Sequence, residues 1–211
     1  MRGETVGCPR LMEKPGLSAA HLAIAFRMEQ VEDRHILALL CHILSGSMSA
    51  RLFSVLREEN GLTYTSSAEI TTFSHFGDLL IYAETDAAKL LANGTKPGVI
   101  PLIIKLLHNL VRKGISEKEL ATAKSYGRGS MSIFADSNAH RAEYNGNLAI
   151  LFPNERRISC TRMYDEVYDK ITLREMNECI RRTFQHEKMS VCIIGSKLPA
   201  VARVEEICRR I

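Results

Sequence analysis

Two polar side chains at a predicted corner between a helix and a strand are the residues of this sequence best suited to chemistry. Arg57 lies in the last turn of the predicted helix, and Tyr64 begins the strand that follows. A guanidinium and a phenol can both donate hydrogen bonds to an oxygen that carries negative charge. Both residues also have ordinary structural explanations, because an arginine complements the dipole at a helix C-terminus and tyrosine is common in strands. Their surroundings must decide between the two interpretations.

The corner is predicted from local signals in residues 44–64. A loop of serine and glycine precedes the helix, and either Ser47 or Ser49 can cap its N-terminus. Asn60 and Gly61 end the helix, because glycine suits the left-handed residue that follows a helical C-terminus. Three apolar side chains share one helical face, which we expect to be buried: Leu52, Phe53 and Leu56.

No metal site is predicted from the histidines. A catalytic zinc needs three protein ligands, usually two histidines at helical spacing with a carboxylate nearby. His35 and His42 are seven residues apart on an apolar helix, so we expect core or helix-face histidines. Residues 140–144 approach an inverted H-x-x-E-H motif, but Tyr144 takes the place of the last histidine and is a poor zinc ligand, so we interpret the match as coincidence. The histidines outside that pair are His21, His75, His108, His140 and His186.

No nucleophile is predicted either. Ser130 lies in the middle of a predicted helix, without the G-x-S-x-G turn or the lysine spacing of a phosphate loop. Packing glycines at Gly127 and Gly129 explain that segment better. The cysteines contain no C-x-x-C pair and lie mostly in apolar segments, which is typical of reduced thiols in an intracellular protein. They are Cys8, Cys41, Cys160, Cys179, Cys192 and Cys208.

Composition argues against several other classes of protein. The formal net charge is +4, and no basic run is interleaved with aromatics, so a nucleic-acid partner is not indicated. The apolar runs 36–40 and 99–107 are shorter than a membrane span. The N-terminal residues lack the apolar core of a secretory signal. We therefore expect an intracellular protein, with a cytoplasmic or a mitochondrial location left open.

One domain of the α+β class is predicted over residues 18–211, with an antiparallel or mixed sheet covered by helices on one face. Residues 1–17 hold three glycines and two prolines and are expected to be a leader or linker remnant. Strands are predicted over 21–28, 62–72, 78–85 and 189–194, the middle two forming a hairpin. Helices are predicted over 31–45, up to 113, over 117–135, up to 152, after 172 and over 199–211. Capping boxes at Ser116 and Thr172 begin two of these helices.

Three motifs in order resemble the C-terminal, non-zinc half of the pitrilysin/insulinase zinc peptidases, which include the mitochondrial processing peptidases. Residues 44–64 are similar to the signature L-G-G-x-x-S-S-R-L-F-x-x-L-R-E-x-x-G-L-A-Y, with Ser45 and Ala50 replacing a Gly and a Ser. Residues 77–82 resemble the family's G-x-F-x-I-Y strand, and residues 114–124 resemble its G-I-T-x-x-E-L-x-x-A-K helix start.

The likeness extends to nearly the whole chain. Residues 191–195 look like the closing V-V-x-V-G strand of the family, and the similarity runs from about Ser18 to Ser196. It implies an α+β half-barrel that pairs with a homologous half around a peptide. It also implies that Arg57 and Tyr64 donate hydrogen bonds to the substrate carbonyl or the developing oxyanion, which suits their chemistry.

The resemblance places the zinc outside this chain. No metal or cofactor is expected to bind here, and zinc is expected in a partner half, on the same longer polypeptide or on a separate subunit. The isolated chain is therefore not expected to hydrolyse peptides. One alternative is a non-proteolytic structural or assembly subunit that keeps the fold, as the core subunits of respiratory complexes resemble this family. A stand-alone zinc enzyme is the third and least supported interpretation.

Overall fold

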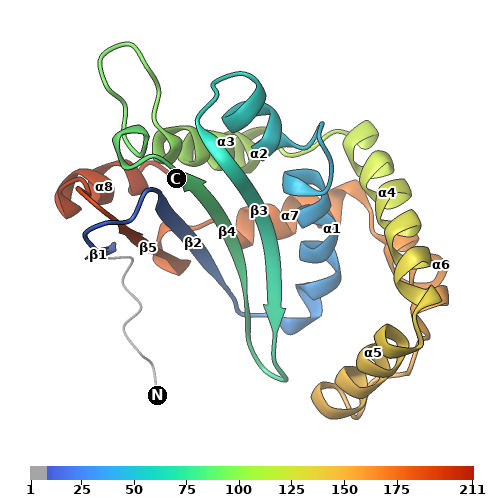
Figure 1. Cartoon of the computed structure of the whole chain (residues 1–211). Helices are drawn as coiled ribbons and strands as arrows, with labels where there is room; N and C mark the ends of the chain where they lie inside the picture. The colour runs from blue at the N-terminus through green and yellow to red at the C-terminus, as the bar shows by residue number, and fades with distance from the viewer. Residues whose placement is uncertain (1–8) are drawn as a thin grey trace.

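The computed structural model describes residues 9–211, which form a five-stranded mixed sheet with helices against one face (Figure 1). The strand order is β1-β5-β2-β4-β3. β1 and β5 are parallel, whereas β5, β2, β4 and β3 pair antiparallel in that order. The strands are β1 (Arg10–Glu13), β2 (Ala20–Met28), β3 (Thr63–Thr72), β4 (Gly77–Thr85) and β5 (Met189–Gly195). The predicted α+β class is confirmed.

The helices form a layer behind the sheet and an arm beside it (Figure 1). α1, α3 and α7 lie in the layer, and α4 packs against α1 and leads into the arm with α5 and α6. The bounds are α1 (Arg34–Ser45), α2 (Arg51–Phe53), α3 (Val99–Lys113), α4 (Glu117–Asp136), α5 (Asn138–Leu151), α6 (Met163–Glu166), α7 (Leu173–Thr183) and α8 (Val201–Cys208). Across residues 9–211, no helix combines the length and the apolar character that crossing a bilayer requires.

Alternation along the central strands explains why the helices cover one face of the sheet. In β2, Leu22, Ile24 and Phe26 are fully buried, whereas Arg27 on the opposite face is exposed. Successive side chains of a strand point to opposite faces, so the apolar set lies together under the helices. The Phe26 ring meets the ring of Phe184, just after α7, edge to face at 4.9 Å between centroids.

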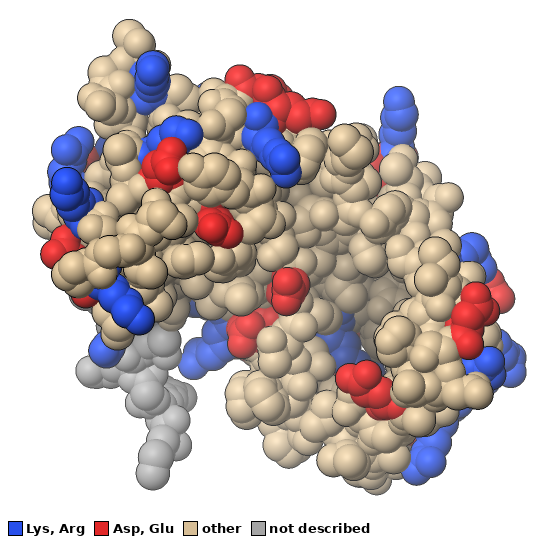
Figure 2. Space-filling view, in the orientation of Figure 1, with Lys and Arg blue, Asp and Glu red and all other residues tan. Residues whose placement is uncertain are grey.

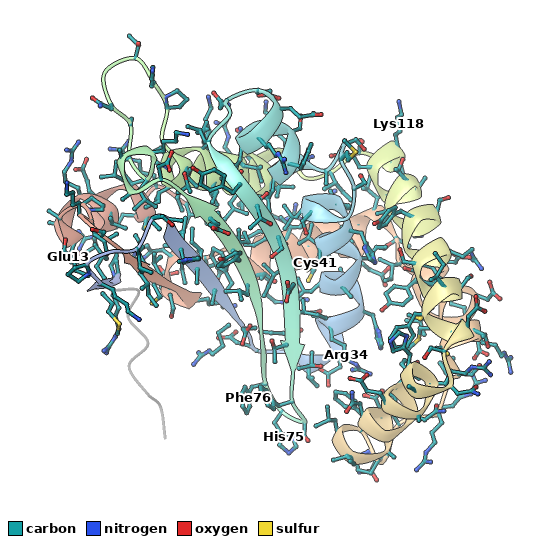
Figure 3. All side chains as sticks on the ribbon, viewed as in Figure 1. Glu13, Arg34, Cys41, His75, Phe76 and Lys118 are labelled. Atoms are coloured by element: carbon teal, nitrogen blue, oxygen red, sulfur yellow. The ribbon has the colours of Figure 1, made fainter. Side chains whose placement is uncertain are left out.

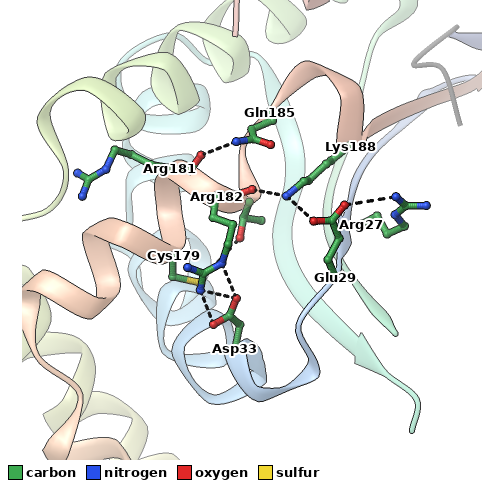
Figure 4. Close-up of polar contacts among 9 residues, drawn as sticks. Arg27, Glu29, Asp33, Cys179, Arg181, Arg182, Gln185 and Lys188 are labelled. Atoms are coloured by element: carbon green, nitrogen blue, oxygen red, sulfur yellow. Dashed lines mark hydrogen bonds and ion pairs between the residues drawn. The ribbon is translucent and has the colours of Figure 1, made fainter. Parts of the chain in front are cut away.

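An ion pair between a buried carboxylate and a half-buried guanidinium joins the start of α1 to α7 (Figure 4). Nη2 of Arg182 donates to both carboxylate oxygens of Asp33, at 2.6 and 2.7 Å. Lys188 donates to the Arg182 carbonyl oxygen at 2.8 Å and pairs with Glu29 at 3.0 Å. Because Asp33 is only 9% exposed, its charge depends on the guanidinium for compensation.

Both predicted capping boxes are confirmed. Ser116 Oγ accepts from the Glu119 N–H at 3.3 Å, and the Glu119 carboxylate accepts from the Ser116 N–H at 2.9 Å. At the start of α7, the same reciprocal bonds join Thr172 and Glu175, at 3.2 and 2.8 Å. These signals succeed because a capping box involves only four consecutive residues.

The N-terminal segment departs from the prediction at residues 10–13. We expected the fold to begin after residue 17, but this segment forms β1 and pairs with β5 from Arg10–Cys192 to Glu13–Gly195. Leu11 packs against the core while Met12 is 62% exposed, so the short strand leaves little apolar pattern in the sequence. The expected leader over residues 1–8, including Cys8, lies outside the described residues.

One of the two predicted packing glycines brings α4 close to α6. A Cβ at Gly127 would overlap the hydroxyl of Tyr164, so only glycine permits this contact. A Cβ at Gly129 would meet nothing within 4 Å, and Ser130 beside it is exposed. The packing interpretation therefore holds for Gly127 and is wrong for Gly129.

Candidate functional site

The corner between α2 and β3 is built by a widened helical turn. α2 continues into a π-helical turn, Ser54–Glu58, in which the Glu59 N–H donates to the Ser54 carbonyl oxygen at 2.9 Å. The Asn60 side chain donates to the Val55 carbonyl oxygen at 2.7 Å. It thereby gives a partner to one of the last carbonyl groups of the helix, which a helix end leaves without intrahelical bonds. Such π-turns often occur at functional sites. The sequence predicted the helix but not the wider turn.

Gly61 turns the chain from the helix into β3. Its φ is +58°, in the left-handed region, as expected for a helix-ending glycine. The Gly61 N–H donates to the Arg57 carbonyl oxygen at 3.0 Å, and the Leu62 N–H donates to the Leu56 carbonyl oxygen at 2.8 Å. These bonds place Arg57 and Tyr64 on the two sides of one tight turn.

The start of the helix differs from the prediction. Ala50 occupies the N-cap position and makes no side-chain capping bond, and its N–H donates to the Ser47 carbonyl oxygen at 3.0 Å. The hydroxyls of Ser47 and Ser49 contact each other at 3.1 Å instead. Of the predicted apolar face, Leu52 and Leu56 are fully buried, whereas Phe53 is partly exposed.

Arg57 contacts the strand that carries Tyr64. Its Nη1 donates to the Tyr64 backbone oxygen at 3.3 Å, and its guanidinium carbon lies 5.4 Å from the centroid of the Phe53 ring. The Arg57 side chain is exposed. The structure therefore brings the two predicted residues into contact, through the backbone of Tyr64 rather than between their side chains.

Tyr64 is 57% exposed, and its hydroxyl donates to Oδ1 of Asp86 at 2.8 Å. This hydrogen bond, together with the negative charge of Asp86, raises the pKa of Tyr64. Asp86 is in turn paired with Lys89 at 2.9 Å. Hydrogen bonds from Lys89 and then from Tyr64 lower the pKa of Asp86.

Asp86 and Lys89 are members of the corner that the sequence analysis missed. A signal was present, because the predicted hairpin pairs β3 with β4 and the first residue of β3, Thr63, lies opposite the last residue of β4, Thr85. A β-bulge between Thr63 and Thr65 leaves Tyr64 without a partner residue in β4, and its hydroxyl reaches Asp86, the residue after Thr85. Sequence separation concealed this relation, since Asp86 follows Tyr64 by 22 residues.

Ser45 fixes the strand that carries Tyr64 against the helix layer. Its Oγ accepts from the Ala68 N–H at 2.8 Å and lies 3.3 Å from the Cys41 carbonyl oxygen, to which it donates. The serine that replaces a signature glycine thus joins the last turn of α1 to the edge strand β3. It occupies part of the hydrogen-bonding edge that β3 would otherwise expose.

Two cavities have neither Arg57 nor Tyr64 in their lining. The larger, of about 440 Å³, lies between α1, β3, α4 and α5 and is lined mostly by apolar and aromatic side chains, with Arg34, His35 and Glu143 among its polar ones. Figure 2 shows a hollow between the sheet side of the molecule and the helical arm, with few charges on its walls. The smaller, of about 180 Å³, lies beside the Arg51–Glu119 ion pair. His75 and Phe76, at the hairpin tip, lie at the opposite end of the strands from α2 (Figure 3).

The histidines form no arrangement suited to zinc. Within residues 9–211, no group of three or more His, Cys, Asp or Glu side chains could hold a metal ion. Burial lowers the pKa of His35 to about 4, aided by the charge of Arg34, and burial also lowers the pKa of His42. The Tyr144 hydroxyl donates to the Ile158 carbonyl oxygen at 3.0 Å, so it serves the packing of the arm.

Comparison with known proteins gives consistent results. The chain is 29% identical over 183 residues to an uncharacterized zinc protease of Bacillus subtilis, covering 84% of this chain and 42% of the relative. It is 26% identical over 196 residues to an uncharacterized zinc protease of Mycobacterium tuberculosis, covering 92% and 42%. The chain thus spans less than half the length of these curated relatives.

Solved structures share the fold. A peptidase M16 inactive domain from Pseudomonas fluorescens superposes with a TM-score of 0.75 at 22% identity, covering 91% of this chain and 44% of that one. A chain of complex III2 from Candida albicans gives 0.78 at 17% identity, covering 96% and 49%. A family model, described as the peptidase M16 inactive domain, matches residues 4–126, more than half of the sequence. The chain therefore belongs to the peptidase M16 inactive-domain family.

Proposed function

We propose that this chain is the substrate-binding half of a zinc peptidase, in which Arg57 and Tyr64 donate hydrogen bonds to the carbonyl oxygen of the peptide bond being cleaved. The observation that carries the proposal is the corner itself. The π-turn and Gly61 hold an exposed guanidinium and an exposed phenol at one turn of the chain. Donors of this kind stabilise the charge that develops on oxygen during peptide hydrolysis.

The zinc of this peptidase belongs to a partner half. The described residues of this chain offer no group of ligands for it. The curated relatives, described as zinc proteases, are more than twice as long as the region that this chain matches. Their remaining length leaves room for a homologous half that carries the metal. The partner half belongs either to the same longer polypeptide as this chain or to a separate subunit.

A second candidate function is a structural subunit without peptidase activity. One structure with this fold is a chain of complex III2 from Candida albicans, which favours an assembly role in some proteins of this shape. Arg57 and Tyr64 would then have no substrate to contact. Their replacement would leave assembly intact, and this outcome separates the two candidates.

The test is reconstitution of cleavage. The chain is mixed with the part of the Bacillus subtilis relative that it does not match, and cleavage of a fluorogenic peptide library is measured. Tyr64→Phe and Arg57→Ala are each expected to lower kcat about a hundred- to a thousandfold. Tyr126→Phe, which removes an exposed hydroxyl on α4, is the matched control and keeps full activity. Undiminished cleavage by both corner variants in an active mixture contradicts the proposal.

A split form of the relative itself controls for the mixing. If the two parts of the relative restore cleavage and this chain binds the partner part without cleavage, the structural candidate is favoured. Binding is measured separately by size-exclusion chromatography, so that a failure to associate is not counted as a failure of chemistry.

A further inference from the structure

The hydroxyl that we assign to the substrate is already engaged within this chain. Tyr64 donates its hydroxyl hydrogen to Asp86 at 2.8 Å, although 57% of the tyrosine is exposed. A phenol carries one hydrogen to donate and two lone pairs that accept. The same hydrogen therefore cannot be donated to Asp86 and to a peptide carbonyl at the same time.

Asp86 is held in this position from its other side. Lys89 ends the 3-10 turn Ala87–Lys89, its N–H donates to the Asp86 backbone oxygen at 2.9 Å, and its Nζ pairs with Asp86 Oδ2 at 2.9 Å. The same Nζ lies 3.5 Å from the Gly61 carbonyl oxygen. Asp86 is thus linked both to the end of β4 and to the turn that precedes Tyr64.

We propose that Asp86 competes with the substrate for the Tyr64 hydroxyl, so that a peptide carbonyl must displace Asp86 before Tyr64 can donate to it. This inference rests on the proposed function of Tyr64. Asp86 then weakens the binding of the substrate carbonyl to Tyr64. A residue that positioned the phenol would have the opposite effect, because its loss would lower activity.

The charges around the Tyr64 hydroxyl favour its hydrogen bond to Asp86 over the ordinary pH range. Asp86 raises the pKa of Tyr64, and the charge of Glu84 adds to the effect while Lys89 opposes it. Asp86 itself has a lowered pKa, chiefly because Lys89 donates to it. Between about pH 5 and pH 9 the carboxyl is ionised and the phenol is protonated. Competition by Asp86 is therefore constant over that range and is relieved by displacement rather than by titration.

The hydrogen bond between Tyr64 and Asp86 is tested on the isolated chain by NMR titration of tyrosines labelled at Cζ. The Tyr64→Phe variant assigns the Tyr64 signal. Asp86→Ala is expected to lower the pKa of Tyr64 measurably. Asp78→Ala is the control, since Asp78 lies opposite Arg27 and Thr71 in the sheet, at the other end of β4. This substitution should leave the pKa of Tyr64 unchanged. An unchanged Tyr64 pKa in Asp86→Ala would overturn the proposal without any measurement of cleavage.

The competition is tested in the reconstituted peptidase. Asp86→Ala is expected to raise kcat/KM about two- to fivefold, as for an exposed charged contact. The same substitution in the Tyr64→Phe background should have no effect, because the contested hydroxyl is gone. A fall in kcat/KM in Asp86→Ala would show that Asp86 positions Tyr64 and would sink the proposal. If no mixture cleaves, the proposed function fails, and the NMR titration still decides whether Asp86 holds the hydroxyl.

Discussion

At the scale of a residue, His35 shows how burial determines the charge of one side chain. It lies on α1 with its ring 5.6 Å from that of Tyr168, edge to face, and burial followed by the charge of Arg34 lowers its pKa to about 4. The folded protein therefore holds neutral imidazole at neutral pH. The charged form is the one that folding disfavours.

This lowered pKa predicts a loss of stability in acid. Because the folded pKa lies below the unfolded value of about 6.5, His35 stabilises the fold above that value and loses its contribution as pH falls toward 4. We expect His35→Gln to reduce the fall in the free energy of unfolding between pH 7 and pH 4 by on the order of 2 kcal/mol. Urea unfolding at several pH values measures it.

The exposed histidine of the hairpin tip provides the control. His75→Gln makes the same chemical change at an exposed position, so it shows how much of any effect comes from replacing histidine by glutamine itself. An identical loss of stability in acid for His35→Gln and the parent would contradict the assignment. His42, whose pKa burial also lowers, would then be the next residue to replace.

The corner residues divide into those that local sequence predicts and those it does not. Arg57, Gly61 and Tyr64 lie within eight consecutive residues, so helix-ending and strand signals place them together. Asp86 and Lys89 reach the corner through the pairing of β3 with β4. Their contact with Tyr64 depends on the β-bulge between Thr63 and Thr65, and a single extra residue in a strand leaves no clear apolar pattern in the sequence.

At the scale of an element, α4 carries two glycines with different structural roles. Gly127→Ala introduces a methyl group where the Tyr164 hydroxyl lies, so α4 and α6 must separate. We expect a loss of about 1–3 kcal/mol in the free energy of unfolding. Gly129→Ala, in open space on the same helix, should gain about 0.5–1 kcal/mol, because alanine favours helices.

Thermal or urea unfolding of the two variants checks this contrast within one helix. Equal effects of the two substitutions would show that α4 does not approach Tyr164 as the structure describes. The sequence predicted a packing role for both glycines, since glycine spacing alone carries no information about what faces it. The partner, Tyr164, lies 37 residues beyond Gly127 and could not be inferred locally.

Most elements were predictable because their signals are local. The strands with alternating apolar residues and the helices with capping boxes or stop glycines lie close to their expected bounds. β1 and the sheet order were not predicted, because a four-residue edge strand with one inward apolar side chain leaves almost no pattern. The π-turn after α2 was also missed, since its backbone bond from Glu59 to Ser54 leaves the apolar pattern of the helix unchanged.

At the scale of the whole molecule, this chain is expected to depend on a partner for its metal. The isolated chain should bind no stoichiometric zinc after equilibrium dialysis, because its described residues bring together no group of ligands. Its unfolding temperature should be the same with and without EDTA, since a metal that does not bind the folded chain cannot stabilise it. In the reconstituted pair, EDTA should abolish peptide cleavage, and zinc should restore it.

Zinc analysis and calorimetry of the chain alone, together with cleavage assays of the pair, distinguish zinc bound by this chain from zinc bound by the partner half. One zinc per isolated chain, with a higher unfolding temperature, would support the interpretation as a stand-alone zinc enzyme, which needs no partner. Cleavage that survives EDTA in the pair would contradict a zinc peptidase altogether. Loss of cleavage with no change in this chain would place the metal in the other half, because only that half then carries a group that EDTA can remove.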